Sequence, residues 1–481
     1  MQIIKNFCAL LLVLFASTHQ FTFAQTIEGE PDSVVKTLNN FSSDKQLVIG
    51  GINISGNKKT KPYIILREAT FKVGDTLSLQ SLTEKIQRSK EYIYNTTLFV
   101  DDSVYVSSVR HDSVLINIVV KERWYFFPLP YLRPVDRNIN QWLSQGAGLD
   151  RVNYGIKLTH NNFSGQNDKL NIWFITGYNQ QVSLRYNLPF IDKALTKGID
   201  VGFTLSRQHE INYATSLNNQ QLFLKLTDQF ARHLTRFDAT YSYRPDQRQR
   251  HYFRISYTND KIADTVFQTN PNYYPDGRKE INYIDFLYAY RYINTNYLYY
   301  PTKGLLLEGS VYKRGLNKTT DLWQLSIHGL YAKTISPKTY ATIESAASVR
   351  FANTNNFYSQ SLFGYGNYQM RGLEYYVADG TAGAITRFTI GHELFKYIFH
   401  TPIIKTKTHD KIPFRFFLTA YTDVGYSYNP YVNNNLLNNK FLYTYGIGLD
   451  IVSIYDFVLR LNFSFNQMGE NGLYLHARND F

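Results

Sequence analysis

The stretch Asp456-Phe-Val-Leu-Arg-Leu-Asn-Phe-Ser-Phe-Asn466 decides the fold class of this chain. Apolar side chains occupy every second position from Phe457 to Phe465, and polar side chains lie between them, with Val458 as the exception. Successive side chains of a β-strand point to opposite faces, so this period of two predicts a strand with one apolar and one polar face. The last segment, 473–481, alternates in the same way.

The pattern extends over nearly all of residues 151–481, with one strand for about every 21 residues. The sixteen candidate strands are 151–163, 167–179, 180–191, 198–213, 222–233, 234–246, 249–262, 280–298, 304–315, 321–336, 339–352, 384–399, 414–428, 441–455, 456–469 and 473–481. Strands of about 9–11 residues that cross a bilayer, joined by alternating short and long connections, produce such spacing. An even number of strands suits a closed antiparallel barrel.

A soluble β-sandwich would alternate in the same way, so other features must separate the two folds. No helical cover is predicted in this region, and the chain has 40 Tyr and 33 Phe, which suit the aromatic girdles of membrane barrels. The final residue, Phe481, is a common ending of bacterial outer-membrane barrels and is expected to act as a targeting signal. We therefore predict a mainly β protein with a 16-stranded antiparallel transmembrane β-barrel over 151–481.

The composition of the 481 residues argues against several other classes of protein. Aromatic residues make up 16% and charged residues 19%, whereas disordered chains are poor in aromatics and rich in charge. No run of about 18 apolar residues occurs, which argues against transmembrane helices. The net charge of +13 comes from basic residues scattered along the chain, so we expect no nucleic-acid partner.

The N-terminus is predicted to be a secretory signal peptide over residues 1–24. A positive charge at Lys5, a short apolar core from Phe7 to Ala16 and a small residue at the end support this prediction. The alternative, a membrane anchor, would need about 20 apolar residues. Cys8 is the only cysteine and lies in this segment, so we expect the exported chain to have neither thiol catalysis nor a zinc–thiolate site.

Residues 47–123 form a different unit, which follows a polar and aperiodic lead-in at 25–46. The predicted elements are a strand at 48–54, a helix from Pro62, a helix at 78–95, and strands at 100–106 and 114–120. This β-α-α-β-β order predicts a small α+β domain. Residues 124–150, rich in proline and aromatics, are expected to connect it to the barrel.

Residues 47–123 resemble a POTRA domain through the turns Gly56-Asn57 and Gly74-Asp75, with Arg67-Glu68 and Glu122-Arg123. The barrel half is similar to the bacterial surface antigen superfamily, which includes BamA, TamA and the two-partner-secretion transporters. The motifs that carry this similarity are Asn162-Phe-Ser-Gly165, Tyr300-Pro-Thr-Lys-Gly304, Gly364 to Gly372, and Thr422-Asp-Val-Gly425. Their order across both domains is the specific part of the resemblance.

One motif, Gly364-Tyr-Gly366-Asn-Tyr-Gln-Met-Arg371-Gly372-Leu373, lies in the longest connection, at about 353–383. The resemblance implies that the Arg-Gly tip folds back into the barrel lumen, where the arginine meets an acidic residue on the wall. Asp423 matches that acid by position, and Glu393 is a second candidate partner. Leu373 stands where the family usually has an aromatic residue. The alternative is that Arg371 is a solvated loop residue.

The resemblance implies a factor of the BamA/TamA type, which inserts or translocates other proteins at the bacterial outer membrane. An edge strand of the POTRA-like domain, in the periplasm, would take unfolded outer-membrane or secreted client proteins by β-augmentation. The alternative for this domain is a structural spacer, because an exposed edge is not proof of use. Outer-membrane lipid and a periplasmic or outer-membrane partner protein are the other expected partners.

A different class of function stays open, namely a passive channel or lipid-handling barrel whose POTRA-like domain docks a periplasmic partner. We expect no enzyme activity, no cofactor and no metal site. His392-Glu393 lacks the second histidine of a zinc-protease helix, because position 396 is Lys. The paired carboxylates Asp101-Asp102 are expected to lie in a turn and to be solvated rather than catalytic.

Overall fold

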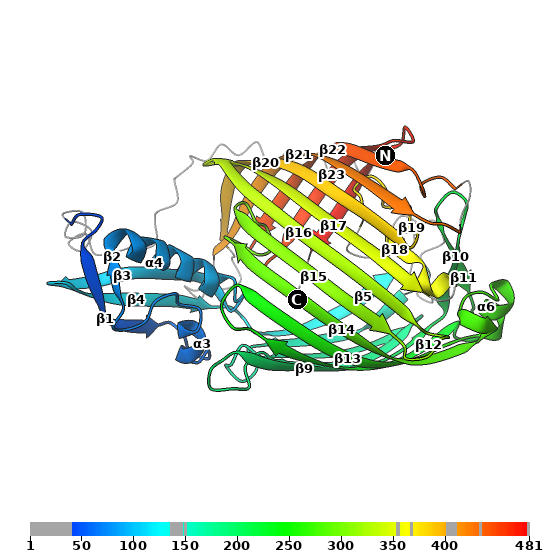
Figure 1. Cartoon of the computed structure of the whole chain (residues 1–481), viewed down its shortest axis with the longest axis horizontal. Helices are drawn as coiled ribbons and strands as arrows, with labels where there is room; N and C mark the ends of the chain where they lie inside the picture. The colour runs from blue at the N-terminus through cyan, green and yellow to red at the C-terminus, as the bar shows by residue number, and fades with distance from the viewer. Residues whose placement is uncertain are drawn as a thin grey trace.

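The structure is a computed structural model that describes residues 41–134, 148, 152–352, 356–365, 369–400, 411–431 and 435–478. It has a small α+β domain beside a large antiparallel sheet that curls into a barrel (Figure 1). The predicted signal peptide, Gly366 and Phe481 lie outside the described residues. The predicted fold class, mainly β with a 16-stranded antiparallel barrel and an N-terminal α+β domain, is confirmed.

The small domain has the predicted β-α-α-β-β order with one short additional strand. Its elements are β1 (Gln46–Ser55), α3 (Pro62–Leu66), β2 (Thr76–Ser78), α4 (Leu79–Tyr94), β3 (Phe99–Arg110) and β4 (Ser113–Glu122). The sheet order is β2-β1-β4-β3, which leaves β3 as a long edge strand. The side chain of Ser78 caps α4 by accepting the backbone N–H of Ser81 at 3.2 Å. Leu82 and Ile93 of α4 are buried in the hydrophobic core with β1 and β4.

The large sheet has sixteen strands in the described part of the chain, and all of its pairs are antiparallel. They are β5 (Phe126–Pro134), β6 (Val152–Asn161), β7 (Lys169–Gly177), β8 (Gln180–Leu188), β9 (Lys197–Gln208), β12 (Arg232–Tyr243), β13 (Gln249–Ile262), β14 (Glu280–Thr295), β15 (Gly304–Arg314), β16 (Leu322–Ser336), β17 (Thr339–Ala352), β20 (Ala382–His400), β21 (Lys411–Tyr428), β22 (Phe441–Ser453), β23 (Val458–Asn466) and β24 (Asn471–Arg478). Each strand pairs with its neighbours in this order.

Shorter elements lie in the connections at the end of the barrel away from the small domain (Figure 1). They are β10 (Glu210–Thr215), β11 (Gln221–Lys225), α6 (Asp264–Thr269), η2 (Pro275–Gly277), η3 (Phe357–Ser359), β18 (Ser361–Phe363) and β19 (Ala378–Asp379). We call this the distal end, and the opposite end, which meets the small domain, the domain-side end. None of the helices in the described ranges is long and apolar enough to cross a membrane.

Two strand predictions need correction, although the total of sixteen strands is right. The segment 124–150 is not only a connector, because β5 pairs with β6 and is the first strand of the large sheet. The candidate strand 222–233 is not a separate strand of this sheet. Its first residues lie in β11, which pairs with β10 in a two-stranded sheet of the described residues, and its last two residues are the start of β12. Proline within a segment argues against a strand when only the sequence is considered. Apolar and polar side chains alternate in a hairpin at the distal end much as they do in a wall strand.

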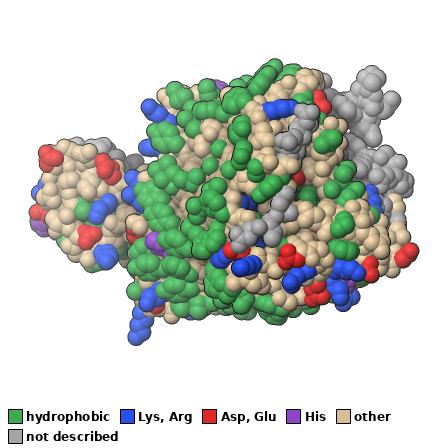
Figure 2. Space-filling model, turned by 45° about the vertical axis from the view of Figure 1, so that its right-hand side comes forward, with side chains coloured by type: hydrophobic (Ala, Val, Ile, Leu, Met, Phe, Trp, Pro, Cys, Tyr) green, Lys and Arg blue, Asp and Glu red, His purple; other side chains and the backbone are tan. Residues whose placement is uncertain are grey.

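The outward-facing side chains of the barrel form an apolar surface. Along β21, the outward-facing Leu418 is 50% exposed, whereas the next residue, Thr419, is buried inside the barrel. Hydrophobic side chains cover a broad band of the barrel surface in Figure 2. Such a band is what a lipid-facing barrel wall requires.

The sheet begins at β5 and ends at β24, and these two strands do not pair with each other in the described part of the chain. We call the region between the free edges of β5 and β24 the seam. A 16-stranded antiparallel barrel closes fully only when its first and last strands also form a ladder. The described part of the wall therefore ends in two unpaired strand edges.

Candidate functional site

We call the connection between β17 and β20 the lumen loop. Its described part lies against the inner face of the barrel wall, and Arg371 is its main polar anchor. The backbone N–H of Arg371 donates to Asp423 Oδ2 at 2.9 Å, and its Nε donates to the same oxygen at 3.0 Å. Its Nη2 also pairs with Asp423 Oδ1. One carboxylate thus accepts hydrogen bonds from both the backbone N–H and the guanidinium of Arg371. These bonds fix the position and the direction of the loop.

The other contacts of Arg371 also come from the wall. Its Nη1 donates to Thr389 Oγ1 on β20 at 3.1 Å. The guanidinium lies over the ring of Tyr421, with 3.9 Å between the guanidinium carbon and the ring centroid. Asp423 is fully buried. The structure therefore does not support the alternative of a solvated Arg371.

Gly372 and Leu373 continue the turn toward β23. Gly372 has φ +86°, and an added Cβ would lie 3.0 Å from the Cβ of Ser464, so a larger residue would be strained there. The side-chain amide of Asn466 donates to the carbonyl of Gly372 at 3.1 Å. Leu373 is buried in a hydrophobic cluster with Met370 and Phe363.

Glu393, the second candidate partner, does not meet Arg371. Its Oε2 accepts a hydrogen bond from Arg415 Nε at 3.0 Å, and its Oε1 lies 3.5 Å from Lys396 Nζ. Both of these partners lie on β20 or β21, so Glu393 belongs to a separate ion pair within the wall.

The distal end of the lumen loop is held by the tip of the β10–β11 hairpin. Asn219 Nδ2 donates to the carbonyl of Val377 at 2.9 Å, and the backbone N–H of Val377 donates to the carbonyl of Asn219 at 2.8 Å. The backbone N–H of Leu437 donates to Asn219 Oδ1 at 2.8 Å. One buried asparagine therefore joins the hairpin, the lumen loop and the β21–β22 connection across the distal end.

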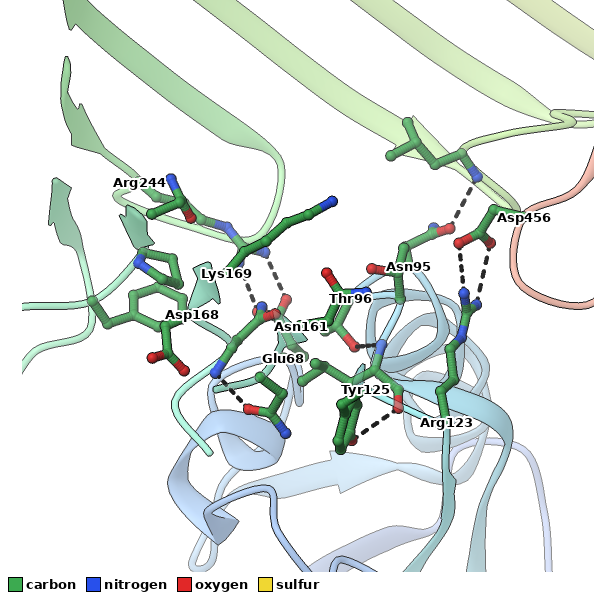
Figure 3. A pocket seen from close by; sticks show the side chains of 18 of the residues that line it. Glu68, Asn95, Thr96, Arg123, Tyr125, Asn161, Asp168, Lys169, Arg244 and Asp456 are labelled. Carbon is green, nitrogen blue, oxygen red and sulfur yellow. Dashed lines mark hydrogen bonds and ion pairs between the residues drawn. The ribbon is translucent and has the colours of Figure 1, made fainter. Parts of the chain in front are cut away.

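The small domain is bound to the domain-side end of the barrel by charged and polar contacts (Figure 3). Glu68 forms a two-point ion pair with Arg244 at 2.7 and 2.6 Å. Asn95 accepts the backbone N–H of Leu298 at 2.9 Å and donates to the carbonyl of Thr295 at 3.1 Å. The cavity between the domain and the barrel has a volume of about 330 Å³ and is lined by residues that include Glu68, Asn95, Arg244 and Leu298.

A second ion pair joins the end of the small domain to the β22–β23 turn. Arg123 Nη1 and Nη2 donate to the two oxygens of Asp456 at 2.6 and 3.2 Å, and both side chains are buried. Tyr297 donates to the same carboxylate at 2.8 Å. Tyr455 and Asp456 have φ of 58° and 61°, the left-handed region that a tight two-residue turn requires. Because β5 begins at Phe126, three residues after Arg123, this pair lies at the domain-side end of the seam.

The turn residues of the POTRA-like motif have structural roles. Gly56 has φ +87°, and an added Cβ would lie 1.9 Å from the carbonyl oxygen of Val120. Asn57 Nδ2 donates to the carbonyl of Thr60 at 3.0 Å. Gly74 has φ +91°, and Asp75 Oδ2 accepts the backbone N–H of Lys72 at 3.0 Å. These contacts shape two loops of the small domain.

The expectation of solvated carboxylates at Asp101-Asp102 is wrong for Asp102. This residue lies in β3, its side chain is buried, and its Oδ2 has no hydrogen-bond partner among the described residues. Burial raises the pKa of Asp102 to about 8; Lys90 opposes the shift and Asp101 adds to it. The alternation of β3 places Asp102 on the same face as the buried Val104 and Val106, which is the signal that the turn interpretation missed.

Sequence patterns alone did not find the partners that join the two domains. The motifs Arg67-Glu68 and Glu122-Arg123 carry no local sign of their partners, and the structure pairs Glu68 with Arg244 and Arg123 with Asp456. Within the described residues, no three His, Cys, Asp or Glu side chains are arranged to hold a metal ion.

Comparison with known proteins identifies two families along the chain. The Omp85 superfamily domain matches residues 162–472, and the POTRA family, described as a surface antigen variable number repeat, matches residues 47–123. No curated protein sequence matches the chain.

Solved structures of low sequence identity are also similar. BamA from Haemophilus ducreyi lacking POTRA domains 1-3 has a TM-score of 0.48 and 16% identity, over 90% of this chain and 83% of that one. CdiB from Escherichia coli has a TM-score of 0.49 and 10% identity, over 99% of this chain and 95% of that one.

Proposed function

This chain belongs to the Omp85 superfamily, and from that premise we propose that it inserts unfolded β-barrel proteins into the bacterial outer membrane. The observation that carries the proposal is the seam, where β5 and β24 do not pair in the described part of the chain. A seam gives an incoming strand access to backbone hydrogen bonds at the level of the membrane.

The contents of the lumen favour insertion at the seam over passage through the barrel. The Arg371 loop lies against the inner wall, and Asn219 joins that loop to two distal connections. Polypeptide moving along the lumen would have to break the Arg371–Asp423 pair and these buried hydrogen bonds, whereas a strand at the seam would leave them intact. In this proposal the loop keeps the wall around β21 and β23 in the arrangement that allows a client strand to insert at the seam.

We further propose that the POTRA-like domain lies in the periplasm and takes clients along β3. This strand is at the edge of its sheet, next to β4, and spans Phe99–Arg110. Backbone pairing with an edge strand makes little demand on client sequence, which suits a factor with many clients. The ion pairs of Glu68 and Arg123 would hold this edge at a fixed place relative to the barrel.

The test reconstitutes the full chain into liposomes and adds a urea-unfolded, eight-stranded outer-membrane barrel protein as the probe. Folding is followed by the gel mobility that distinguishes folded from heat-unfolded barrels. We expect the probe to fold several times faster than in empty liposomes, and Arg371→Ala to remove the acceleration. Arg415→Ala, which breaks the separate pair with Glu393 on the same wall, is the matched control and should retain most of it.

Planar-bilayer recording tests the channel alternative with the same preparations. A steady, large conductance that does not depend on Arg371, with no acceleration of folding, would contradict the insertion proposal and support a passive channel. Transfer of labelled lipid between leaflets, without faster folding, would support lipid handling instead.

A further inference from the structure

The outer edge of β5 lacks most of its hydrogen-bond donors. The backbone N–H of Asn161 donates to the carbonyl of Tyr125 at 2.8 Å, so position 125 faces β6. The backbone N–H and C=O groups of successive strand residues point to alternate sides within the sheet. In β5, the backbone groups of the even-numbered residues therefore point toward the seam. These residues are Phe126, Pro128, Pro130, Leu132 and Pro134. Proline has no N–H, so three of the five seam-facing positions offer only a carbonyl.

The outer edge of β24 keeps all of its donors. The backbone N–H of Asn466 donates to the carbonyl of Glu470 at 3.0 Å. The backbone N–H and C=O groups of the even-numbered residues of β24 therefore point toward β23, and those of the odd-numbered residues point toward the seam. The seam-facing residues are Asn471, Leu473, Leu475 and Ala477. None of them is proline, so each offers both an N–H and a C=O. No strand in the described part of the chain pairs with this edge.

The two edges differ in how well they tolerate being unpaired in a membrane. Leu473 and Leu475 are each 65% exposed on the outer surface, so the β24 edge lies in the apolar band. An unpaired backbone N–H in hydrocarbon is unfavourable, and proline on an edge strand removes that group and blocks strand addition. The β5 edge is therefore suited to remain without a partner strand, because it has few N–H groups to leave unpaired. The β24 edge retains unpaired N–H and C=O groups.

The lumen loop supports β24 from the inside. His476 Nε2 lies 3.2 Å from Glu374 Oε1, and the rings of Tyr474 and Tyr375 are 5.9 Å apart between centroids. Glu374 follows Arg371 by three residues, so the loop that is anchored on Asp423 also contacts the last strand. This contact holds β24 in place without a partner strand on its seam side.

We propose that β24 is the strand-accepting edge of the seam and that β5 is not. This inference rests on the proposed insertion function and specifies which edge binds the client. The occupant is an extended segment of an unfolded membrane protein with alternating apolar and polar residues. Its apolar side chains would lie beside Leu473 and Leu475 in the outer band, and its polar side chains beside Tyr474 and His476 in the lumen.

The prolines of β5 also explain why the seam stays free for a client. If β5 had N–H groups at 128, 130 and 134, it could form a regular ladder with β24 and close the barrel. With carbonyls alone at these positions, at most Phe126 and Leu132 can donate across the seam. An incoming strand that offers a full set of donors and acceptors therefore competes well with β5 for the β24 edge.

The proposal is tested by disulfide trapping in the reconstituted full chain. The chain has one native cysteine, Cys8, in the predicted signal peptide, so single cysteines can be placed at Leu473 or Leu475 on β24 and at Phe126 or Leu132 on β5. The probe is the urea-unfolded eight-stranded barrel with one cysteine in its last strand. We expect mixed disulfides mainly at the two β24 positions. Equal or stronger trapping on β5 would overturn the proposal, as would trapping of a second copy of this chain at β24 in place of the probe.

Proline substitution separates backbone pairing from side-chain contact. Leu475→Pro removes one seam-facing N–H and leaves the bonds to β23 in place, so trapping at position 473 should fall about five- to tenfold. Leu475→Ala keeps the N–H and should lower trapping much less, and Leu132→Pro on β5 should have no effect. Equal losses in Leu475→Pro and Leu475→Ala would contradict a backbone-pairing site.

The reverse substitution gives an independent readout. The double variant Pro128→Val/Pro130→Val restores two donors to β5, and we expect it to pair with β24, to raise the temperature at which the barrel unfolds in gels, and to reduce trapping of the probe. Unchanged trapping and heat resistance would count against the proposal.

The folding rate of the probe is measured in the same samples. Trapping at β24 without faster folding would overturn the insertion function alone, and faster folding without trapping at β24 would overturn this inference alone.

Discussion

Arg371 and Asp423 are joined through both the backbone and the side chain of the arginine, since the N–H and Nε of Arg371 both donate to Asp423 Oδ2, at 2.9 and 3.0 Å. The carboxylate is fully buried in the barrel wall. These hydrogen bonds hold the connection between β17 and β20, which has more than 25 residues, at Asp423 on the inner wall. The same loop also contacts β24, through Glu374 and His476.

We expect Arg371→Ala and Asp423→Ala each to lower the heat resistance of the folded barrel. Removal of one partner leaves a buried charge without compensation, which costs about 3–5 kcal/mol. The double variant should lose little more than either single variant, because the two residues act as a unit. Gel mobility after heating measures this. Fully additive losses would show that the two residues stabilise the barrel independently.

Loss of the Arg123–Asp456 pair is expected to loosen the small domain at the seam. Arg123→Ala leaves Asp456 buried without its cation, whereas Arg88→Ala removes a contact to the neutral Asn294 and serves as the control. Electron-spin distances between labels at Arg110 and Lys303 should broaden in Arg123→Ala and stay narrow in Arg88→Ala. A narrow distribution in both variants would mean that the Glu68–Arg244 pair suffices to hold the domain.

The stability of the POTRA-like domain should fall as pH rises from about 4 to about 8. Burial raises the pKa of Asp102 from 3.8 to about 8, so between these values the folded domain holds a proton that the unfolded chain releases. The stabilisation is fully present below pH 3.8 and is lost as pH rises through the folded-state pKa.

Asp102→Asn should therefore raise the unfolding temperature of this domain at pH 8, with a gain on the order of 3 kcal/mol, and should remove much of its pH dependence. Scanning calorimetry of the full chain in detergent, at pH 5 and pH 8, measures both effects. Asp112→Asn, at an exposed position, is the control and should not stabilise. A wild-type domain that is equally stable at both pH values would contradict the buried, protonated carboxyl.

Deletion of Phe481 is expected to reduce insertion of this chain into the outer membrane, because a terminal aromatic residue is typical of barrels that are recognised for assembly. Phe481→Tyr keeps an aromatic terminus and should retain most of the insertion. Immunoblots of membrane fractions measure the level of each variant. Normal outer-membrane levels of the deletion would contradict a role in targeting.

Much of the fold was predictable because side-chain alternation is local. Fifteen of the sixteen candidate segments each correspond to one wall strand, and the helix from 78 to 95 matches α4. The prediction failed at β5, where prolines at alternate positions remove the strand signal while leaving the bonds to β6 intact. It also failed at 222–233, because alternation cannot say which strand is the neighbour in space.

The site was less accessible to sequence reasoning. Asp423 was identified through the family resemblance, supported by its place on the polar face of its strand, and the structure brings it to Arg371. Arg123 and Asp456 are separated by 333 positions, and no local pattern links them. The asymmetry of the seam depends on which backbone groups of each edge strand point away from its neighbour. No sequence pattern shows that β5 and β24 are the two ends of the sheet.

The most direct test of the central claim is depletion of this protein from its native cell, followed by quantitative proteomics of the outer membrane. We predict that a set of β-barrel proteins falls in the outer membrane within a few generations, that unfolded forms accumulate in the periplasm, and that Arg371→Ala fails to restore the set. Unchanged levels of all outer-membrane barrels, with altered solute uptake or lipid composition, would contradict an insertion factor.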